Sequence, residues 1–370
     1  MDMNTFNHPI GDWVRHSMEQ LIANPQWAST SAWAVNAIIA VIAIVVFPVF
    51  LGAPFLIWME RKVCAHIQAR LGPMRVGSHG SLQSIADVIK LLLKEIVTPK
   101  GVDQFVYYLG PILPLSASFL ALAVIPWDVN MQVSNPSLGI VYIMAVSGLG
   151  IFGILLGSWA SNNKYSLVGG MRAGAQMISY EISLGILMLV VVVLAENTGL
   201  REIVLSQTGP FWKSWWIFKA PVVGLLAFIC YLVSSTAELN RGPFDIAEGE
   251  QEITAGYHTE YSGMAFAMFF LAEYVNMMVQ AALISSFFLG GFLAPHIGLE
   301  SVDNLLNLVP GVVWLLAKMF LIIFIYMWFR WTFPRLRIDQ LIALEWKFLL
   351  PLNLLLLVMA CVLVSLGAIL

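Results

Sequence analysis

The sequence predicts an all-α polytopic membrane protein with about eight transmembrane helices and one amphipathic helix at the membrane surface. Of the 370 residues, 59% are hydrophobic and 11% are charged, whereas about 25% of the residues of a soluble domain are charged. The apolar residues form runs near the ~20 residues that a helix needs to cross a bilayer. We expect a single integral membrane domain over residues 1–370, with no cleavable signal peptide.

Eight apolar runs are candidate transmembrane spans. In chain order they cover residues 34–58, 105–125, 139–159, 172–194, 217–236, 262–288, 311–331 and 347–370. An even number of spans places both ends of the chain on the same side of the membrane. The loops on the other side cover about residues 59–104, 160–171, 237–261 and 332–346.

The basic residues predict how these spans are oriented. Arg15, Arg201, Lys213 and Lys219 lie on the side of the termini, and Lys318 lies within a span. The other fourteen of the nineteen Lys and Arg residues lie on the opposite side, namely Arg61, Lys62, Arg70, Arg75, Lys90, Lys94, Lys100, Lys164, Arg172, Arg241, Arg330, Arg335, Arg337 and Lys347. Because cytoplasmic loops carry an excess of Lys and Arg, we expect these loops in the cytoplasm. Both termini would then lie on the outer side of the membrane.

The first cytoplasmic loop contains the amphipathic helix, over residues 82–96. Its apolar residues fall at positions 82, 85, 86, 89, 92, 93 and 96, on one helical face, while Asp87, Lys90 and Lys94 lie on the other. The segment is too short and too polar to span, so we expect it to lie in the membrane interface and to end before Pro99. It is either a passive helix on the membrane surface or one wall of an entry portal for an amphiphile.

A basic segment, ERKVCAHIQARLGPMRVG, joins the first span to this helix at residues 60–77. A basic cluster beside a membrane is commonly a topology signal or a contact with anionic lipid. Its Gly72-Pro73 pair and Gly77 indicate an ordered turn, because these residues suit fixed turn geometry.

Three ionisable residues stand out because they lie well inside predicted spans, away from the span ends: Glu181, Glu273 and Lys318. A charge at the bilayer centre costs roughly 2.5–3.5 kcal/mol on insertion scales. These residues either pair structurally, for example Glu273 with Lys318, or carry protons across the helix bundle. Intramembrane carboxylates favour the second interpretation.

An acidic run at residues 238–260 is the strongest functional signal in the sequence. It follows the fifth span on the basic side of the membrane, and with nearby Glu273 it gives seven carboxylates: Glu238, Asp245, Glu248, Glu250, Glu252, Glu260 and Glu273. Closely spaced carboxylates cannot all ionise cheaply, so they favour a proton path. Because Gly242 and Pro243 cannot continue the helix, we expect the loop to fold back into the protein. The alternative is a solvated acidic loop.

Other kinds of chemistry lack support in the sequence. Cys64, Cys230 and Cys361 are far apart and show no metal-ligand spacing. The histidines, among them His66, His79 and His258, are scattered and are expected to make polar contacts. No Gly-rich nucleotide motif occurs, so we expect no metal site, no nucleotide or iron–sulfur cluster, and no nucleic-acid partner.

Five segments together resemble the H/ND1 subunit family of respiratory complex I (NADH:quinone oxidoreductase). They are ERKVCAHIQARLGPMRVG, LQSIADVIKLLLKE, AQMISYE, the run from ELNRGPFDIAEGEQEITAGYHTEY to FFLAEY, and RWTFPRLRIDQL. The resemblance covers residues 47–346 in order. It implies an eight-span helical protein at the junction with the peripheral arm, which builds much of a quinone tunnel and holds no redox centre of its own.

The resemblance also implies roles for individual residues. Residues around the quinone tunnel would be Glu60, Arg61, Arg70, Asp87 and Arg241. The proton relay would comprise Asp245, Glu248, Glu250, Glu252 and Glu260, continued into the membrane by Glu181 and Glu273. Quinone would be the substrate, bound at an interface with partner subunits. The implied partners are the peripheral-arm iron–sulfur and quinone-site subunits, the small membrane-arm subunits and membrane lipids.

Two other functions remain open at this point. One is the membrane anchor of a related hydrogenase-type complex, which would need no quinone tunnel. The other is a stand-alone ion transporter, which would be expected to show an inverted repeat of broken spans, a pattern that is not evident in the sequence.

Overall fold

The computed structural model describes residues 46–129, 131–246 and 254–367, and within these ranges the chain forms helices but no β-strand. Seven segments are long and apolar enough to cross a membrane. They are α5 (Gln104–Leu122), α6 (Gly139–Ala160), α7 (Lys164–Ala195), α11 (Pro221–Glu238), α13 (Gly263–Phe288), α15 (Gly311–Thr332) and Ile338–Ser365. The seven overlap the second to the eighth predicted spans, so the all-α polytopic fold is confirmed.

The first predicted span, 34–58, lies mostly outside the described residues. Its described end is helical, with η2 (Phe47–Gly52) leading directly into α3 (Ala53–Ile67). The last span is assembled from α16 (Ile338–Leu344), a π-helical turn η5 (Glu345–Leu349) and α17 (Leu350–Ser365).

Two helices begin earlier than the apolar runs that predict them. Helix α7 begins at Lys164 rather than at residue 172, and its 32 residues make a helix of about 48 Å, longer than the ~30 Å hydrocarbon core of a bilayer. Asn163 caps it, because its side chain accepts a hydrogen bond from the backbone N–H of Tyr165. Likewise, α16 begins at Ile338, within the segment expected to be a loop. Hydropathy identifies the apolar part of a helix and misses its polar extension.

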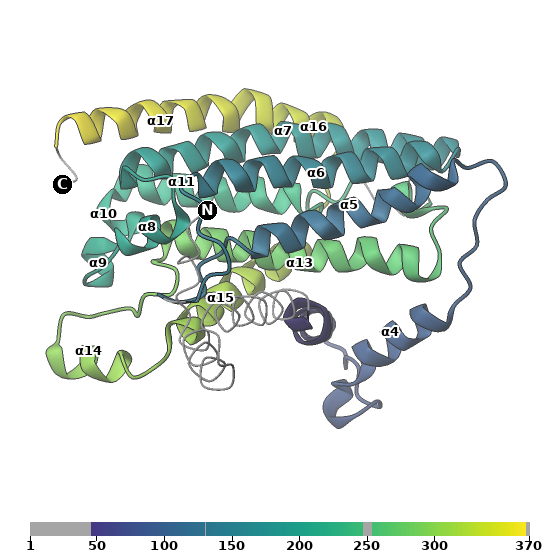
Figure 1. Cartoon of the computed structure of the whole chain (residues 1–370), viewed down its shortest axis with the longest axis horizontal. Coiled ribbons are helices and arrows are strands. Elements are labelled where there is room, and N and C mark those ends of the chain that lie inside the picture. The colour runs from purple at the N-terminus through teal and green to yellow at the C-terminus, as the bar shows by residue number, and fades with distance from the viewer. Residues whose placement is uncertain (1–45, 130, 247–253, 368–370) are drawn as a thin grey trace, which may run out of the picture.

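The amphipathic helix predicted at residues 82–96 is α4 (Gln83–Leu93). It lies at the edge of the bundle and an extended segment connects it to α5 (Figure 1). The apolar side chains of Ile85, Ile89 and Leu92 are exposed on it, as expected for a helix that rests on a lipid surface. The helix ends at Leu93, earlier than Ile96, because Lys94 already has an extended backbone.

The centre of the bundle is formed by α7, α11 and α13, whereas α15 and α17 are more exposed. Figure 1 shows α17 along an outer edge, beside α7. Short helices follow α7 and α13: α8 (Leu200–Leu205), α9 (Phe211–Ser214), α10 (Trp216–Lys219) and α14 (Glu300–Leu306). They gather at the end of the bundle away from α4 (Figure 1).

Glycines allow α5 and α6 to approach closely. A Cβ on Gly153 would lie 2.3 Å from Pro114 Cδ and 2.8 Å from the backbone oxygen of Gly110. Gly153→Ala is therefore expected to destabilise the protein by ~1–3 kcal/mol through overpacking. On the same helix, a Cβ on Gly150 meets nothing closer than 4.0 Å, so Gly150→Ala should be neutral or slightly stabilising. Thermal unfolding of both variants checks this, and equal effects would contradict the close packing.

Candidate functional site

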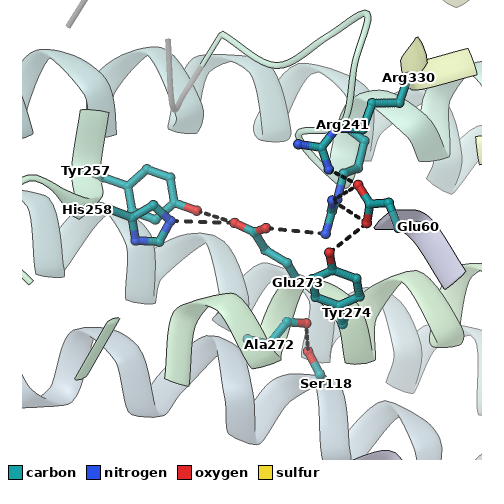
Figure 2. Close-up of polar contacts among 9 residues, drawn as sticks. All are labelled: Glu60, Ser118, Arg241, Tyr257, His258, Ala272, Glu273, Tyr274 and Arg330. Carbon is teal, nitrogen blue, oxygen red and sulfur yellow. Dashed lines mark hydrogen bonds and ion pairs between the residues drawn. The ribbon is translucent and has the colours of Figure 1, made fainter. Parts of the chain in front are cut away.

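A buried carboxylate, Glu60 on α3, lies at the centre of a charged cluster (Figure 2). Arg241 Nη1 is 3.3 Å from both of its oxygens, and Arg330 Nη1 contacts Oε1. Tyr274 donates its O–H to Oε2 at 2.6 Å. Burial would raise the pKa of Glu60, but Arg241, Arg330 and the Tyr274 hydrogen bond together lower it below its ordinary value. The cluster therefore stabilises a charged carboxylate that is only 7% exposed.

Arg241 also reaches a second carboxylate, Glu273 on α13. Its Nη2 lies 3.7 Å from Glu273 Oε2, and its guanidinium stacks on Tyr274 at 4.5 Å from the ring centroid. On the other side of Glu273, Tyr257 donates to Oε1 at 2.8 Å and His258 Nε2 lies 3.6 Å away. Figure 2 shows the resulting row, with one guanidinium between two carboxylates.

The end of α11 places Arg241. The helix stops at Glu238, as Gly242 and Pro243 predict, and the chain turns inward. The backbone N–H of Arg241 donates to Thr236 O, and that of Leu336 donates to Pro243 O. Arg241, Phe244 and Ile246 are 5–6% exposed. The acidic loop therefore begins folded into the protein. Glu248, Glu250 and Glu252 lie outside the described residues.

Two small cavities connect Glu273 to carboxylates deeper in the bundle. The first, of about 60 Å³, is lined by Glu273, Glu238 and Gln280 among others. The second, of about 10 Å³, is lined by Glu238, Gln280, Ser147 and Glu181. The first has room for a few waters, and the second is at the lower limit of about 10–15 Å³ for one water. The carboxylates thus form a spatial series from Glu60 through Glu273 and Glu238 to Glu181.

Neutral polar groups hold the inner two carboxylates. Gln280 donates to Glu238 Oε2 at 2.6 Å, and Tyr231 donates to Gln280 Oε1 at 3.4 Å. Ser147 on α6 donates to Glu181 Oε1 at 2.7 Å. Hydroxyl and amide groups of this kind orient a carboxyl group without fixing its charge, since none of them is a cation.

The remaining predicted site residues lie outside this sequence of carboxylates. Arg61 and Asp87 form an ion pair at 2.6 Å that ties α3 to α4. Arg70 donates to Gln68 at 2.7 Å. Asp245 pairs with Arg335 at 2.9 Å, and Asn163, beside the start of α7, donates to Glu260.

Lys318 does not pair with Glu273, so the pair given as an example of structural pairing is wrong, although Glu273 does pair with Arg241. Lys318 Nζ donates to the carbonyl oxygens of Gly291 and Leu293 at 2.8 and 2.7 Å, and lies 4.4 Å from the Trp215 ring centroid. These backbone oxygens follow the end of α13 and attract a cation. The ammonium is satisfied at the opposite end of the bundle from Arg241.

A large apolar cavity opens next to the charged cluster. Its volume is about 560 Å³, and it lies among α3, α4, α13 and α15. Its lining includes Leu56, Ile85, Met278, Leu316 and Phe320. Leu56 is one helical turn before Glu60 on the same face of α3, so the apolar cavity and the charged cluster share a wall.

Several residues of the site were missed by the sequence analysis. Tyr257, Tyr274 and Gln280 carry no charge, so they gave no signal. Tyr257 lies in the acidic run, and Tyr274 and Gln280 lie in the sixth apolar run. Arg330 was counted only as a topology residue. Glu238 was counted among the seven carboxylates but not in the relay, although its place at the end of a span was visible.

Known proteins of one family are similar to most of this chain. The NADH dehydrogenase family model matches residues 39–361. A Bacteroides thetaiotaomicron protein, the H subunit of NADH-quinone oxidoreductase, is 50% identical over 308 residues, 83% of this chain and 85% of the relative. The protein of the same name from Phocaeicola vulgatus is 49% identical over 303 residues, 82% of this chain and 84% of the relative. One from Bacteroides fragilis is 48% identical over 316 residues, 85% and 87% of the two chains.

Proposed function

The chain belongs to the NADH dehydrogenase family, among the H subunits of NADH-quinone oxidoreductase, and on this premise we propose that it forms the quinone passage and couples quinone reduction to proton movement. The observation that carries the proposal is the shared wall between the 560 Å³ apolar cavity and the Glu60 cluster. The apolar cavity suits an isoprenoid tail, and the Glu60 cluster suits a group that gains negative charge.

The apolar cavity supports a passage from the bilayer. Its lining includes Ser81 and Ile85 at the start of α4, the helix whose exposed apolar face suits the membrane surface. Quinone would enter beside α4, pass along α3 and reach the interface with the peripheral-arm partner subunits. Those partners would supply the electrons and the groups that hold the quinone head.

The coupling step follows from the shared guanidinium. Reduction adds negative charge in a region of low dielectric constant, where Coulomb interactions are strong. When either Glu60 or Glu273 takes up a proton, it loses its charge and interacts less strongly with Arg241. Arg241 then interacts more strongly with the other carboxylate. Protonation of Glu60 and of Glu273 is therefore coupled, and the two cavities continue the path through Glu238 to Glu181. The acidic loop, with Asp245, Glu248, Glu250, Glu252 and Glu260, would line the quinone end.

The same premise supports the proposed setting of the chain. It would lie in the bacterial inner membrane with both termini periplasmic, bound to peripheral-arm iron–sulfur subunits and small membrane-arm subunits. Relatives at 48–50% identity carry the quinone oxidoreductase name, which favours this function over a hydrogenase-type anchor or a stand-alone transporter.

Narrowing the cavity tests the passage. Leu316→Trp, measured in a complex purified through a tag on this chain, should lower turnover with a long-tailed quinone by about tenfold or more, because a ~1.4 kcal/mol rise in barrier has that effect. NADH oxidation by a water-soluble acceptor should be unchanged. Leu321→Trp is the matched control, since Leu321 is exposed on the same helix and does not line the cavity. Wild-type quinone turnover in both variants would refute the passage.

A further inference from the structure

A fully buried carboxylate lies apart from the series of carboxylates Glu60, Glu273, Glu238 and Glu181. Glu345 begins the π-helical turn η5 between α16 and α17, and its side chain is 0% exposed. It faces α7, and its neighbours Leu341 and Leu349 belong to the hydrophobic core. Short π-helical stretches inside helices are frequent at functional sites.

The hydrogen bonds of Glu345 join three segments. Ser183 on α7 donates its O–H to Glu345 Oε1. Asn353 on α17, itself fully buried, donates from Nδ2 to the same Ser183 Oγ at 3.0 Å. Within the described ranges, Glu345 Oε2 and Asn353 Oδ1 are buried and have no hydrogen-bond partner. The cluster therefore has two unused acceptors and lacks a donor.

The described residues around Glu345 are neutral groups. From α7 comes Tyr180, whose O–H donates to Leu341 O at 3.1 Å. From α11 comes the buried thiol of Cys230, which interacts electrostatically with Glu345. Trp346 points its ring N–H to Ser179 on α7, and Lys347 is exposed. Among the residues that the structure describes, no Lys, Arg or His nitrogen lies within 4 Å of Glu345.

A proton resolves both deficits of this cluster. Burying an ionised carboxylate without a cation is costly, and a carboxyl group in such a place is stabilised by neutralisation. A proton on Oε2 removes the charge and turns this unused acceptor into an O–H donor. We propose that Glu345 is a proton-binding site, and that its bound proton holds the α16–α17 junction against α7 through Ser183 and Asn353.

This site is separate from the coupling path. Residues two apart on a helix do not face the same way, so Glu181 faces Ser147 on α6 while Ser183 faces Glu345 on η5. Helix α7 thus carries carboxyl contacts on two sides. Loss of the proton from Glu345 would leave a buried charge between α7, α11 and α17, so the seat of the C-terminal helices on α7 depends on this proton. The inference does not rest on the proposed quinone passage.

Infrared spectroscopy of the purified complex at neutral pH, without quinone, tests the proton directly. Glu345→Gln should remove a carbonyl band of a protonated carboxyl group. Glu196→Gln is the matched control, because Glu196 is exposed, and it should remove only a carboxylate band. Loss of only a carboxylate band in Glu345→Gln would overturn the proposal.

Ser183→Ala gives a second measurement should Glu345→Gln fail to assemble. Removing the serine hydroxyl takes away the hydrogen bond to Oε1, so the carbonyl band of a protonated Glu345 should shift to higher frequency. An ionised Glu345 would leave every carboxylic-acid band in place, and that result would refute the bound proton.

The pH dependence of stability adds a third readout. The folded chain holds a proton that the unfolded chain releases, so stability should fall as pH rises. The thermal unfolding temperature of the wild type should therefore decline toward alkaline pH more steeply than that of Glu345→Gln. Parallel curves would count against the proposal. None of these measurements involves quinone, so a failure here is distinguishable from a failure of the passage.

Discussion

Arg241→Gln is expected to be among the most damaging single substitutions in the described part of the chain. The side chain is 7% exposed and contacts both oxygens of Glu60 as well as Glu273. Among the described contacts, its removal leaves Glu273 without a guanidinium and leaves Glu60 with Arg330 and the Tyr274 hydroxyl. Breaking a buried ion pair from one side costs ~3–5 kcal/mol. Thermal unfolding and the yield of chain in the purified complex measure this loss.

Arg335→Gln is the control for this prediction. Arg335 pairs with Asp245 at 2.9 Å, but its side chain is 40% exposed, and exposed ion pairs contribute ~0–1 kcal/mol. Equal losses in the two variants would show that burial does not govern these contacts. Arg241→Lys should recover only part of the stability, because a single ammonium cannot serve both carboxylates with the geometry of a guanidinium.

The pH dependence of the stability of the wild type and of Arg241→Gln gives an independent check. The pKa of Glu60 is lowered in the folded protein from 4.5. The stability that this carboxylate contributes is therefore present above its unfolded pKa and is lost as pH falls through the folded pKa. The stability difference between wild type and Arg241→Gln should shrink as the solution is acidified below about pH 4.5. A difference that stays constant would mean that charge at Glu60 is not the cause.

Hydropathy and helical periodicity predicted most of the fold. Seven spans match helices within a few residues at most ends, because a bilayer restricts the chain to helices of sufficient length. The amphipathic pattern at residues 82–96 predicted α4 for the same kind of reason. Helix starts were less accurate. Asn163 begins α7 through a capping hydrogen bond, which leaves no hydropathy signal.

The carboxylates of the site were visible in the sequence, but their partners were not. Glu181 and Glu273 are unusual in apolar runs, so they were predicted. One alternative paired Lys318 with the carboxylate of Glu273. In the structure Lys318 instead donates hydrogen bonds to the backbone oxygens of Gly291 and Leu293. A sequence pattern cannot indicate such a partner, because every residue has a carbonyl oxygen.

Glu345 shows a different limit of sequence reasoning. It falls in the segment expected to be a cytoplasmic loop, where a carboxylate needs no explanation. The structure makes that segment helical and packs it on α7, so the same residue becomes a buried acid. Its importance depends on a helix boundary, and boundaries are the least certain part of a prediction from sequence.

Glu181→Gln is expected to lower proton pumping strongly while the protein remains assembled. Glutamine keeps the side-chain oxygen that accepts from Ser147 at 2.7 Å, but an amide cannot bind and release the proton. A relay interrupted at its inner end should therefore lose most of its proton translocation for each NADH oxidised. Pumping by the complex in sealed vesicles, compared with its quinone turnover, measures this ratio. Glu252→Gln, in the acidic loop outside the described residues, should instead lower coupled turnover.

Ser147→Ala distinguishes the ability of Glu181 to bind a proton from the hydrogen bond that orients it. It removes the hydrogen bond to Glu181 but keeps the carboxyl group, so pumping should be reduced less than in Glu181→Gln. Glu196→Gln, which changes an exposed carboxylate after the end of the same helix, should pump normally. If Glu181→Gln and Glu252→Gln both keep the wild-type ratio of protons to electrons, the carboxylates from Glu60 to Glu181 are not the path. If Ser147→Ala is as impaired as Glu181→Gln, the orientation of the carboxyl group, in addition to its presence, limits proton transfer.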